Sequence, residues 1–543
     1  MKHLLLATLK LPLDLEDEEC VRSVSNLVSI AATGAQDSAV TLQELADAIE
    51  THQGMEYLDP LAVLPALLPC RGDHAKRLVR ACGLHSNAKE VIIVVQEAIE
   101  ELHRYYRIGD DETQAKPITG PVQRFTNLIV LCTTAIPRLK LGKNSAFQLA
   151  SPFITDITSL ASSVAQDVTK CEGRTLLSDI SGLVKALFLW ATASVSGNDF
   201  DEMKRILRDL LDTTVVAYAS LIQASLSARE FECIFPKLTV KSAIEEGWAN
   251  GENAMANVQD ARGVLDAAHC PGTPEPRSIS DLIYLAHAKP IIPLPSTTPS
   301  QIYPLLLGSL RRNIAVDESL FLLLRVLAPD DPKSAENTIP PDIAEPLCTV
   351  LSALASTHLD AFIRHLNLRL VSLVLSKVHP ALRVGILLRL TADEEFPQIR
   401  GPAVGLLKET VLEALGSPNH STEPSPFASP ALLRTFGPIL FRTTPPDFLT
   451  IDHPREELEH SLELLRITDC LSFYYILLLR DRENRTKVQD VDNILSVERS
   501  LLHPLRQFLN QCAHMKDERP MSLLALQVSL ERIEDALATI KFP

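Results

Sequence analysis

Apolar side chains recur along most of this chain with the 3.6-residue period of an amphipathic helix, and the strict alternation of a β-strand is missing. The period predicts long helices over 86–108, 146–170, 174–196, 198–228, 303–327, 454–482, 487–515 and 520–541. Many of the 36 prolines fall at first-turn positions or in short connections, where one helix ends and another begins. We therefore expect an all-α fold.

Two neighbouring stretches share one helix–turn–helix pattern. The dipeptides Ile363-Arg364 and Ile399-Arg400 lie 36 residues apart, and each follows acidic residues and opens a leucine-rich helix. A further helix is expected ahead of each, at about 342–356 and 379–392. Repeated helix pairs near this length are typical of HEAT-type arrays. The sequence thus predicts an α-solenoid of HEAT/armadillo-like helical repeats.

The arginines of this repeat lie in an unusual place. Arg400 falls within the apolar arc of its helix and in the first turn, where the helix dipole disfavours a cation. We expect Arg364 and Arg400 to lie in the seam between repeats and to pair with a carboxylate of Asp360, Asp393 or Glu394, since an unpaired buried charge is costly. The alternative is that the stem of Arg400 crosses apolar surface and its charged end reaches water.

Local composition divides the chain into five parts. Three are rich in helix signals, and two are rich in proline, serine and other loop residues. The parts are N-terminal helical repeats (1–268), a Pro-rich loop (269–300), HEAT-like repeats (301–415), a linker-like loop (416–432) and a C-terminal helical region (433–543).

Composition and charge narrow the function classes. Only 20 glycines and 5% aromatic residues accompany a hydrophobic fraction of 46%, which favours helices over strands. The formal net charge is −16 and no dense basic run occurs, so we expect no nucleic-acid binding. No apolar run approaches the roughly 20 residues of a membrane-spanning helix, so we expect no membrane insertion. We expect a cytoplasmic protein, with the nucleus left open as a second compartment.

Motifs for catalysis or cofactor binding are not found. The chain has no glycine-rich phosphate loop, and the pair His453 and His460 around Glu456 reads better as a helix start after Pro454 than as a metal site. We therefore expect no enzyme activity, no metal and no cofactor.

Three side chains are candidates for redox or binding roles. The ten cysteines are scattered without a CxxC pair, and Cys270, in a Pro/Gly loop beside His269, is the candidate redox thiol. Tyr474 and Tyr475 are candidates for partner contact, because tyrosine near arginine is common at interface hot spots. Helical spacing also allows these tyrosines to be core residues.

Two segments resemble a known family. EEFPQIRGPAVGLLKETVLEAL, residues 394–415, is similar to the signature segment of the Yap-binding protein/aberrant-root-formation protein/glomulin family. DFLTIDHPREELEHSLELLRITDCLSFYYILLLRDRENRTKV, residues 447–488, is similar in layout to fungal members. The resemblance is best from about 300 to 541 and weak over the first 250 residues.

The resemblance implies a non-enzymatic α-solenoid that acts by binding other proteins. Yeast-type members bind an oxidative-stress bZIP transcription factor and promote its peroxide-dependent oxidation, and some are tied to kinetochores. Glomulin binds the RING subunit of cullin ubiquitin ligases and blocks ubiquitin transfer. We accordingly expect a monomeric adaptor for a stress-responsive bZIP factor, with inhibition of a cullin-ligase RING subunit as the alternative; the residues do not separate the two.

Overall fold

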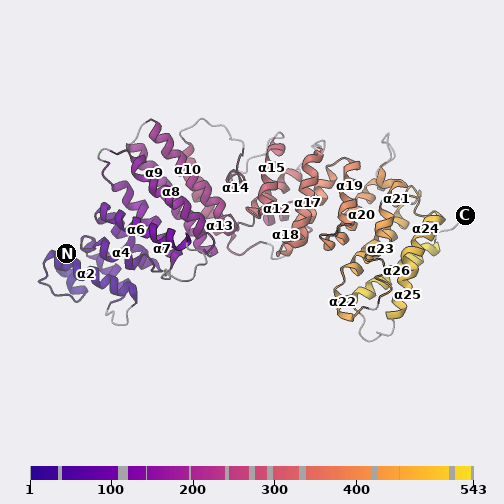
Figure 1. The fold of residues 1–543 in the computed structure, drawn as a ribbon, viewed down its shortest axis with the longest axis horizontal. Helices are drawn as coiled ribbons and strands as arrows, with labels where there is room; N and C mark the ends of the chain where they lie inside the picture. The colour runs from indigo at the N-terminus through magenta and orange to yellow at the C-terminus, as the bar shows by residue number, and fades with distance from the viewer. Residues whose placement is uncertain are drawn as a thin grey trace. The chain divides into compact units, whose positions relative to one another are not determined.

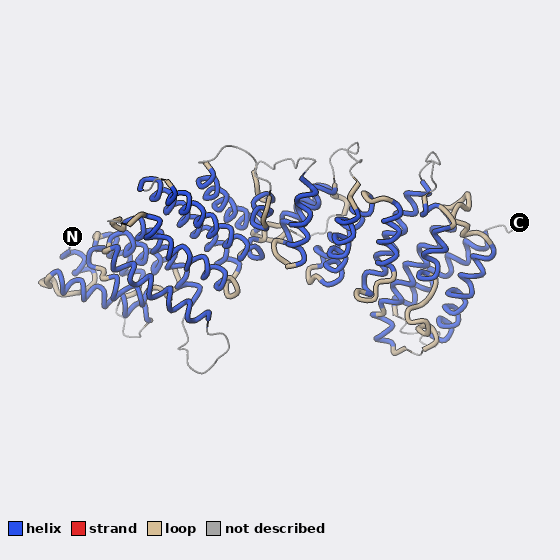
Figure 2. The backbone as a smooth tube through the Cα atoms, turned by 45° about the horizontal axis from the view of Figure 1, so that its top comes forward, coloured by secondary structure: helices blue, strands red, loops and turns tan. Residues whose placement is uncertain are grey.

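The computed structural model of the protein contains helices and connecting turns (Figures 1 and 2). It describes residues 2–34, 40–107, 120–141, 144–194, 197–238, 244–267, 276–289, 298–328, 338–416, 425–451, 453–512 and 520–539. No strand occurs within these ranges. The expected all-α helical-repeat fold is therefore confirmed. Large parts of the two predicted loops, 268–275, 290–297 and 417–424, lie outside the described residues.

The chain folds into two compact units. Unit 1 comprises residues 1–229 and 241–319, and unit 2 comprises residues 230–240 and 320–543. The helices α12 (Leu226–Ile234) and α16 (Val316–Leu327) begin in unit 1 and end in unit 2.

The other helices of unit 1 follow one another through short connections. They are α1 (Lys2–Thr8), α2 (Asp17–Thr33), α3 (Leu42–Thr51), α4 (Pro60–Leu67), α5 (Asp73–His85), α6 (Ala88–Arg107), α7 (Pro121–Ala135), α8 (Ala146–Val164), α9 (Lys170–Ser194), α10 (Asn198–Ala217), α11 (Ala219–Ile222), α13 (Trp248–Asp266), α14 (Ile279–Ala286) and α15 (Thr298–Arg311). Helices α4 and α7 begin with first-turn prolines, Pro60 and Pro121, of the kind expected from the sequence. Helix α3 begins with a capping box formed by Thr41 and Glu44.

The core of unit 1 forms where α7 packs against α5, α6 and α9. Phe125, Leu128 and Leu131 of α7 are fully buried there, and each such side chain contributes about 1.5–3 kcal/mol by leaving water. One stretch, Lys170–Ala193 of α9, has the length and composition of a membrane-spanning helix. In unit 1 it packs against α7, α10 and α13, and half of its most apolar window is buried, as for a core helix.

Unit 2 continues the same construction. Its helices are α17 (Pro341–Thr357), α18 (Ala361–Ser376), α19 (Pro380–Thr391), α20 (Arg400–Gly416), α21 (Ala431–Leu440), α22 (Arg455–His460), α23 (Leu462–Arg480), α24 (Val491–Val497), α25 (His503–Gln511) and α26 (Met521–Thr539). A short π-helical turn, Glu498–Leu502, joins α24 to α25.

The core of unit 2 is built around α23, which packs against both α20 and α26. Leu464, Ile467 and Leu471 of α23 are fully buried. Gly401 allows the close approach of α20, because a Cβ atom at this position would stand 2.9 Å from Oδ2 of Asp469 on α23. The close contact between α20 and α23 therefore depends on the absence of a side chain at Gly401.

The repeat read in the sequence forms two helix pairs. The first pair is α17 with α18, and the second is α19 with α20, preceded by the 3₁₀ turn Pro397–Ile399. Asp360 caps the first turn of α18 by accepting a hydrogen bond from the Phe362 amide at 2.8 Å. Both helix pairs lie close to the predicted ranges.

The repeat arginines bind carbonyl groups of their own turns, which corrects the expected pairing with carboxylates. Arg400 Nε donates to the backbone carbonyl of Asp393, while the carboxylate of Asp393 accepts from the Phe396 amide at 2.8 Å. Arg364 Nη1 donates to the carbonyls of His358 and Leu359 at 2.7 and 2.9 Å. Within the described residues neither arginine forms an ion pair. A turn carbonyl satisfies the guanidinium at lower cost than a second buried charge would.

Several predicted long helices are interrupted. The range 303–327 breaks between Arg311 and Val316, where Asn313 and Ala315 take left-handed φ values of 55° and 51°. The range 454–482 breaks at Ser461, whose hydroxyl accepts from the Leu464 amide at 3.3 Å and caps α23. A break of a few residues leaves the apolar period almost unchanged, so periodicity alone does not reveal it.

Candidate protein-binding surface

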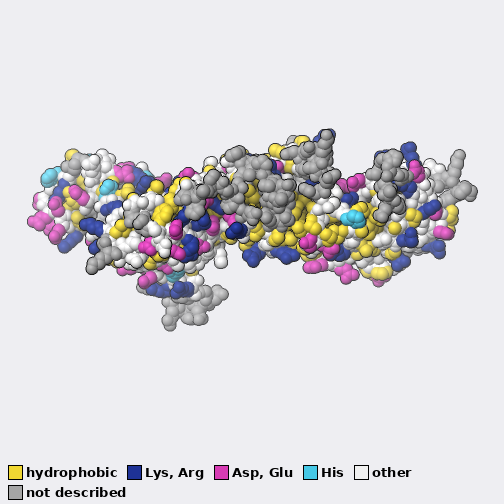
Figure 3. All heavy atoms as spheres, turned by 90° about the horizontal axis from the view of Figure 1, so that it is seen from above, with side chains coloured by type: hydrophobic (Ala, Val, Ile, Leu, Met, Phe, Trp, Pro, Cys, Tyr) yellow, Lys and Arg dark blue, Asp and Glu magenta, His cyan; other side chains and the backbone are white. Residues whose placement is uncertain are grey.

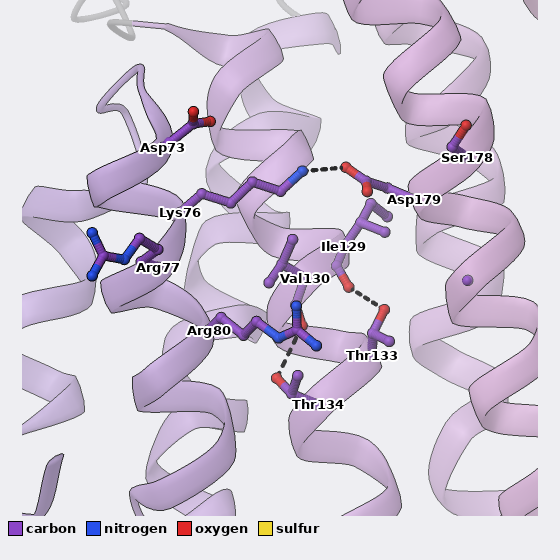
Figure 4. Close-up of a pocket in the computed structure, with 11 residues that line it drawn as sticks. Asp73, Lys76, Arg77, Arg80, Ile129, Val130, Thr133, Thr134, Ser178 and Asp179 are labelled. Atoms are coloured by element: carbon purple, nitrogen blue, oxygen red, sulfur yellow. Dashed lines mark hydrogen bonds and ion pairs between the residues drawn. The ribbon is translucent and has the colours of Figure 1, made fainter. Parts of the chain in front are cut away.

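A cleft of unit 1 lies between α5 and α9, with α7 as its floor (Figure 4). Its volume is about 490 Å³. The lining side chains are mostly charged or hydroxylic, over a small apolar floor formed by Ile129 and Val130. We call it the unit 1 cleft.

Most charges in the unit 1 cleft are paired within the fold. Lys76 extends from α5 to Asp179 of α9, with 2.8 Å between Nζ and Oδ2 (Figure 4). Arg77 points away from the cleft and donates to Glu50 and Asp47 of α3, and these hydrogen bonds to the two carboxylates raise the pKa of Arg77. The cleft thus resembles a charged seam between helices.

The hydroxyl groups of the cleft are also engaged. Thr133 donates to the Ile129 carbonyl at 2.7 Å, and Thr134 donates to the Val130 carbonyl at 2.9 Å. The described residues that line the cleft include no histidine, cysteine or tyrosine. The charged and hydroxylic side chains of the cleft can form ion pairs and hydrogen bonds with a bound molecule.

Exposed apolar side chains are concentrated in the last helices of unit 2. Hydrophobic side chains reach the surface among charged ones on the face drawn in Figure 3. In the described part of α23, α24 and α26, the exposed large hydrophobic residues are Leu462, Leu465, Leu479, Val491, Leu495, Met521, Leu524 and Val528. Exposed apolar residues that share one side of a helix mark interaction sites more often than single exposed leucines do.

Helix α26 carries apolar residues on two opposite faces. Its inner face packs on α23 through the buried residues Leu523, Leu526 and Leu530. Its outer face begins with the exposed residues Met521, Leu524 and Val528, which we call the α26 stripe. These three residues recur at i, i+3 and i+7, so they share one side of the helix. Met521 is 77% exposed.

The helix is held in place from both ends. Ser522 Oγ donates to the carbonyl of Leu458, at the end of α22, at 2.8 Å. Arg506 of α25 pairs with Glu534 at 2.6 Å. Further along the outer face, Glu531 and Asp535 replace the apolar side chains. A surface helix normally presents a polar outer face, so the α26 stripe is where unit 2 departs from that pattern.

The two candidate tyrosines occupy different environments. Tyr474 is 1% exposed, and its ring meets that of Phe441 edge to face at 5.3 Å between centroids. Burial raises the pKa of Tyr474. It is a core residue, the alternative that the helical spacing allowed, and a partner cannot reach it on the folded surface. Tyr475 is half-buried.

The candidate redox thiol, Cys270, lies outside the described residues. Among the described cysteines, Cys171 and Cys233 are exposed. Burial raises the pKa to about 12 for the cysteines Cys82, Cys132, Cys348 and Cys470. A thiol with such a pKa holds almost no thiolate at neutral pH, so these four are packing residues.

The histidine pair of the sequence lies just before the start of α22 and at its end. His453 contacts the carbonyl of Phe448 at 2.8 Å and lies 3.3 Å from Glu457. Over the described ranges, no group of three or more histidine, cysteine, aspartate or glutamate side chains has the arrangement of a metal site.

Sequence analysis missed the α26 stripe. Seven of the ten residues of MSLLALQVSL, residues 521–530, are apolar, and they occupy the outer side of the helix as well as the inner side. The helical period alone does not show which of them stay exposed. Their exposure in the structure makes this side a candidate contact surface.

Part of the chain matches a known protein family. Residues 301–538 match the family described as "Uncharacterised protein family, YAP/Alf4/glomulin". No curated protein matches the chain. The matched range contains most of unit 2, including the α26 stripe.

Proposed function

Because residues 301–538 belong to the YAP/Alf4/glomulin family, we propose that the protein is a helical-repeat adaptor that acts by binding other proteins. The observation that carries this proposal is the α26 stripe, a row of exposed apolar residues within the matched region. The family is of a helical protein-binding type, and we propose that the chain has no catalytic activity of its own.

The α26 stripe has the chemistry of an interface anchor. Methionine adapts to irregular apolar surfaces, and leucine and valine add firm contacts on either side. Covering apolar surface contributes about 25 cal/mol per Å². Three such side chains can therefore supply part of the free energy that a complex needs to offset the cost of association.

For the partner, we propose a stress-responsive bZIP transcription factor in the oxidative stress response, in the cytoplasm and the nucleus. The resemblance to fungal members supports this choice. The second candidate is the RING subunit of a cullin ubiquitin ligase, which the protein would inhibit by covering it. We propose that the adaptor itself is a monomer.

The test is affinity purification of the tagged protein from its own cells, with and without peroxide, followed by mass spectrometry. Wild type would be compared with a Met521→Glu/Leu524→Glu variant, which places two charges on the stripe. Leu359→Glu is the matched control, because Leu359 is also an apolar residue of unit 2, 97% exposed, outside α23–α26.

Each outcome has a definite meaning. A bZIP factor whose recovery changes with peroxide, and which is lost in the stripe variant alone, supports the stress-adaptor role. Recovery of a cullin with its RING subunit would replace that role by ligase inhibition. If the stripe variant and the Leu359→Glu control retain the same partners as wild type, the α26 stripe is not the binding surface.

A further inference from the structure

A concave site in unit 2 lies between α21 and α24. It has a volume of about 180 Å³ and continues along the turn after α24. We call it the α21–α24 groove. This volume is below the roughly 300–1,000 Å³ of small-molecule sites, so the groove has room for one or two side chains.

The floor of the groove is apolar. Phe441, just after α21, and Val497 of α24 are buried beneath it, and Leu433 is half-buried at its side. Asn493 and Ser500 add polar groups on the α24 side. An apolar side chain seated here would lie near Phe441 and Val497, with amide and hydroxyl groups of Asn493 and Ser500 at its edge.

Two arginines stand at the groove without a carboxylate partner. Arg434 and Arg442 are exposed, and within the described residues no acidic group lies at ion-pair distance from either. None of the described residues that line the groove is acidic. This is notable in a chain of net charge −16, where Arg466, next to the groove, is paired with Glu463 at 2.6 Å.

The backbone of α21 is open toward the groove. Pro438 lies inside α21 and has no N–H group, so it cannot donate to the carbonyl of Arg434 as an ordinary residue would. Gly437 lines the groove, and a Cβ atom there would meet the ring of Phe441 alone, at 3.9 Å. Incoming backbone can therefore approach this helix closely.

We propose that the α21–α24 groove binds an acidic peptide segment of a protein partner. One apolar side chain of the segment lies on Phe441 and Val497, and flanking carboxylates pair with Arg434 and Arg442. Charge complementarity selects this occupant, because two unpaired guanidinium groups flank an apolar floor that carries no acid. The inference rests on the proposed role as a protein-binding adaptor and specifies the chemistry of what it binds.

The experiment uses the purified full-length protein and a fluorescein-labelled peptide in which aspartate and glutamate alternate with leucine and phenylalanine. Binding is followed by fluorescence anisotropy at low and at physiological salt. A second peptide carries asparagine and glutamine in place of the acids. We expect the acidic peptide to bind and the neutral one to bind at least about tenfold more weakly, since each charged hydrogen bond lost costs such a factor.

Two kinds of variant test the location. Arg434→Glu/Arg442→Glu should weaken binding of the acidic peptide by at least about tenfold. Arg482→Glu, an exposed charge reversal elsewhere in unit 2, should leave this binding unchanged. Gly437→Leu fills the groove while removing a helical glycine, so it should block binding without loss of helix. Gly437→Ala is its control and should bind like wild type.

Several results would overturn the proposal. They are no binding of the acidic peptide, equal binding of the neutral peptide, equal effects of Arg482→Glu and the double reversal, or no effect of Gly437→Leu. Tighter binding of a labelled single-stranded RNA at the same arginines would assign the groove to phosphate groups. The adaptor role and the groove proposal can fail separately. If the stripe variant loses its cellular partner and the wild-type protein does not bind the acidic peptide, the adaptor role is supported and the groove proposal is wrong.

Discussion

Arg466 shows how a charge can be buried inside unit 2. Its surface is 3% exposed, and it pairs with Glu463 at 2.6 Å. It also donates to the carbonyls of Ile439 and Arg442 at 3.2 and 2.6 Å. Although burial disfavours the charge, the hydrogen bond that Arg466 donates to Glu463 raises the pKa of Arg466. The side chain thereby ties α23 to the end of α21, beside the groove.

Arg466→Ala should lower the free energy of unfolding of unit 2 by about 3–5 kcal/mol, because it leaves the Glu463 carboxylate buried and unpaired. Urea denaturation followed by far-UV circular dichroism would measure the change. Arg482→Ala, at an exposed position, should stay within about 0.5 kcal/mol of wild type. Equal effects of the two substitutions would show that the buried network carries no stability.

The repeat arginines give a second prediction at this scale. Since Arg400 binds the carbonyl of Asp393 while the carboxylate caps Phe396, a double-mutant cycle of Arg400→Met and Asp393→Asn should give a coupling energy below about 0.5 kcal/mol. Denaturation of the four proteins supplies the cycle. A coupling well above that value would restore the carboxylate pairing expected from the sequence.

These residues also show what sequence can predict. The position of Arg400 in an apolar arc identified it correctly as a cation in need of a partner. The partner could not be identified, because a backbone carbonyl is present in every residue and leaves no mark in the sequence. The same holds for Tyr474, where helical spacing allowed both a core and a surface position and the packing of Phe441 decided between them.

At the scale of elements, helices were predictable and their breaks were less so. The apolar period placed α6 and α26 close to their observed bounds, whereas α8 ends at Val164, six residues before the predicted end at 170. The left-handed residue Asn313, which ends α15, gave no such signal. The exposure of the outer face of α26 was not predicted for a different reason. An apolar period identifies the residues that share one face of a helix, but it does not show whether another helix, a partner or water covers that face.

One helix start depends on a residue far away in sequence. The carboxylate of Asp317, on α16, accepts from the amides of Leu226 and Ser227 at 2.8 and 2.9 Å and from the Ser227 hydroxyl at 2.6 Å. It thereby caps the first turn of α12 within unit 1. Burial, with the neighbouring Glu318, raises the pKa of Asp317 despite these donors.

The raised pKa predicts a pH dependence. The folded chain keeps a proton on Asp317 at pH values where the unfolded chain has released it, so the contribution of this group to stability falls as pH rises from 3.8 through the raised pKa. Asp317→Asn removes the titration. The difference in free energy of unfolding between Asp317→Asn and wild type should therefore move in favour of the variant as the pH rises above 3.8 toward the raised pKa.

The measurement is denaturation at several pH values, with Ser227→Ala as the control that loses a donor and keeps the carboxylate. The control should follow the pH dependence of wild type at lower stability. A constant difference between wild type and Asp317→Asn across the range would mean that Asp317 titrates alike in the folded and unfolded chains.

At the scale of the whole molecule, charge separates the two proposed contacts. The chain carries −16, so an acidic peptide is repelled at long range and attracted near Arg434 and Arg442. Salt screens both effects, with a Debye length of about 10 Å at about 0.1 M. The α26 stripe is apolar, and contacts made by burying apolar surface are not weakened by screening.

Partner capture that depends on Met521 and Leu524 should therefore persist as salt is raised, whereas binding of the acidic peptide to the α21–α24 groove should weaken. The comparison is anisotropy of the peptide against capture of the purified partner at low and high sodium chloride, each repeated with the corresponding variant. A partner complex that weakens in parallel with the peptide would place its main contact at the arginines. One that persists, and is abolished by Met521→Glu/Leu524→Glu alone, would make the apolar stripe the anchor and the groove a second, charge-selective contact.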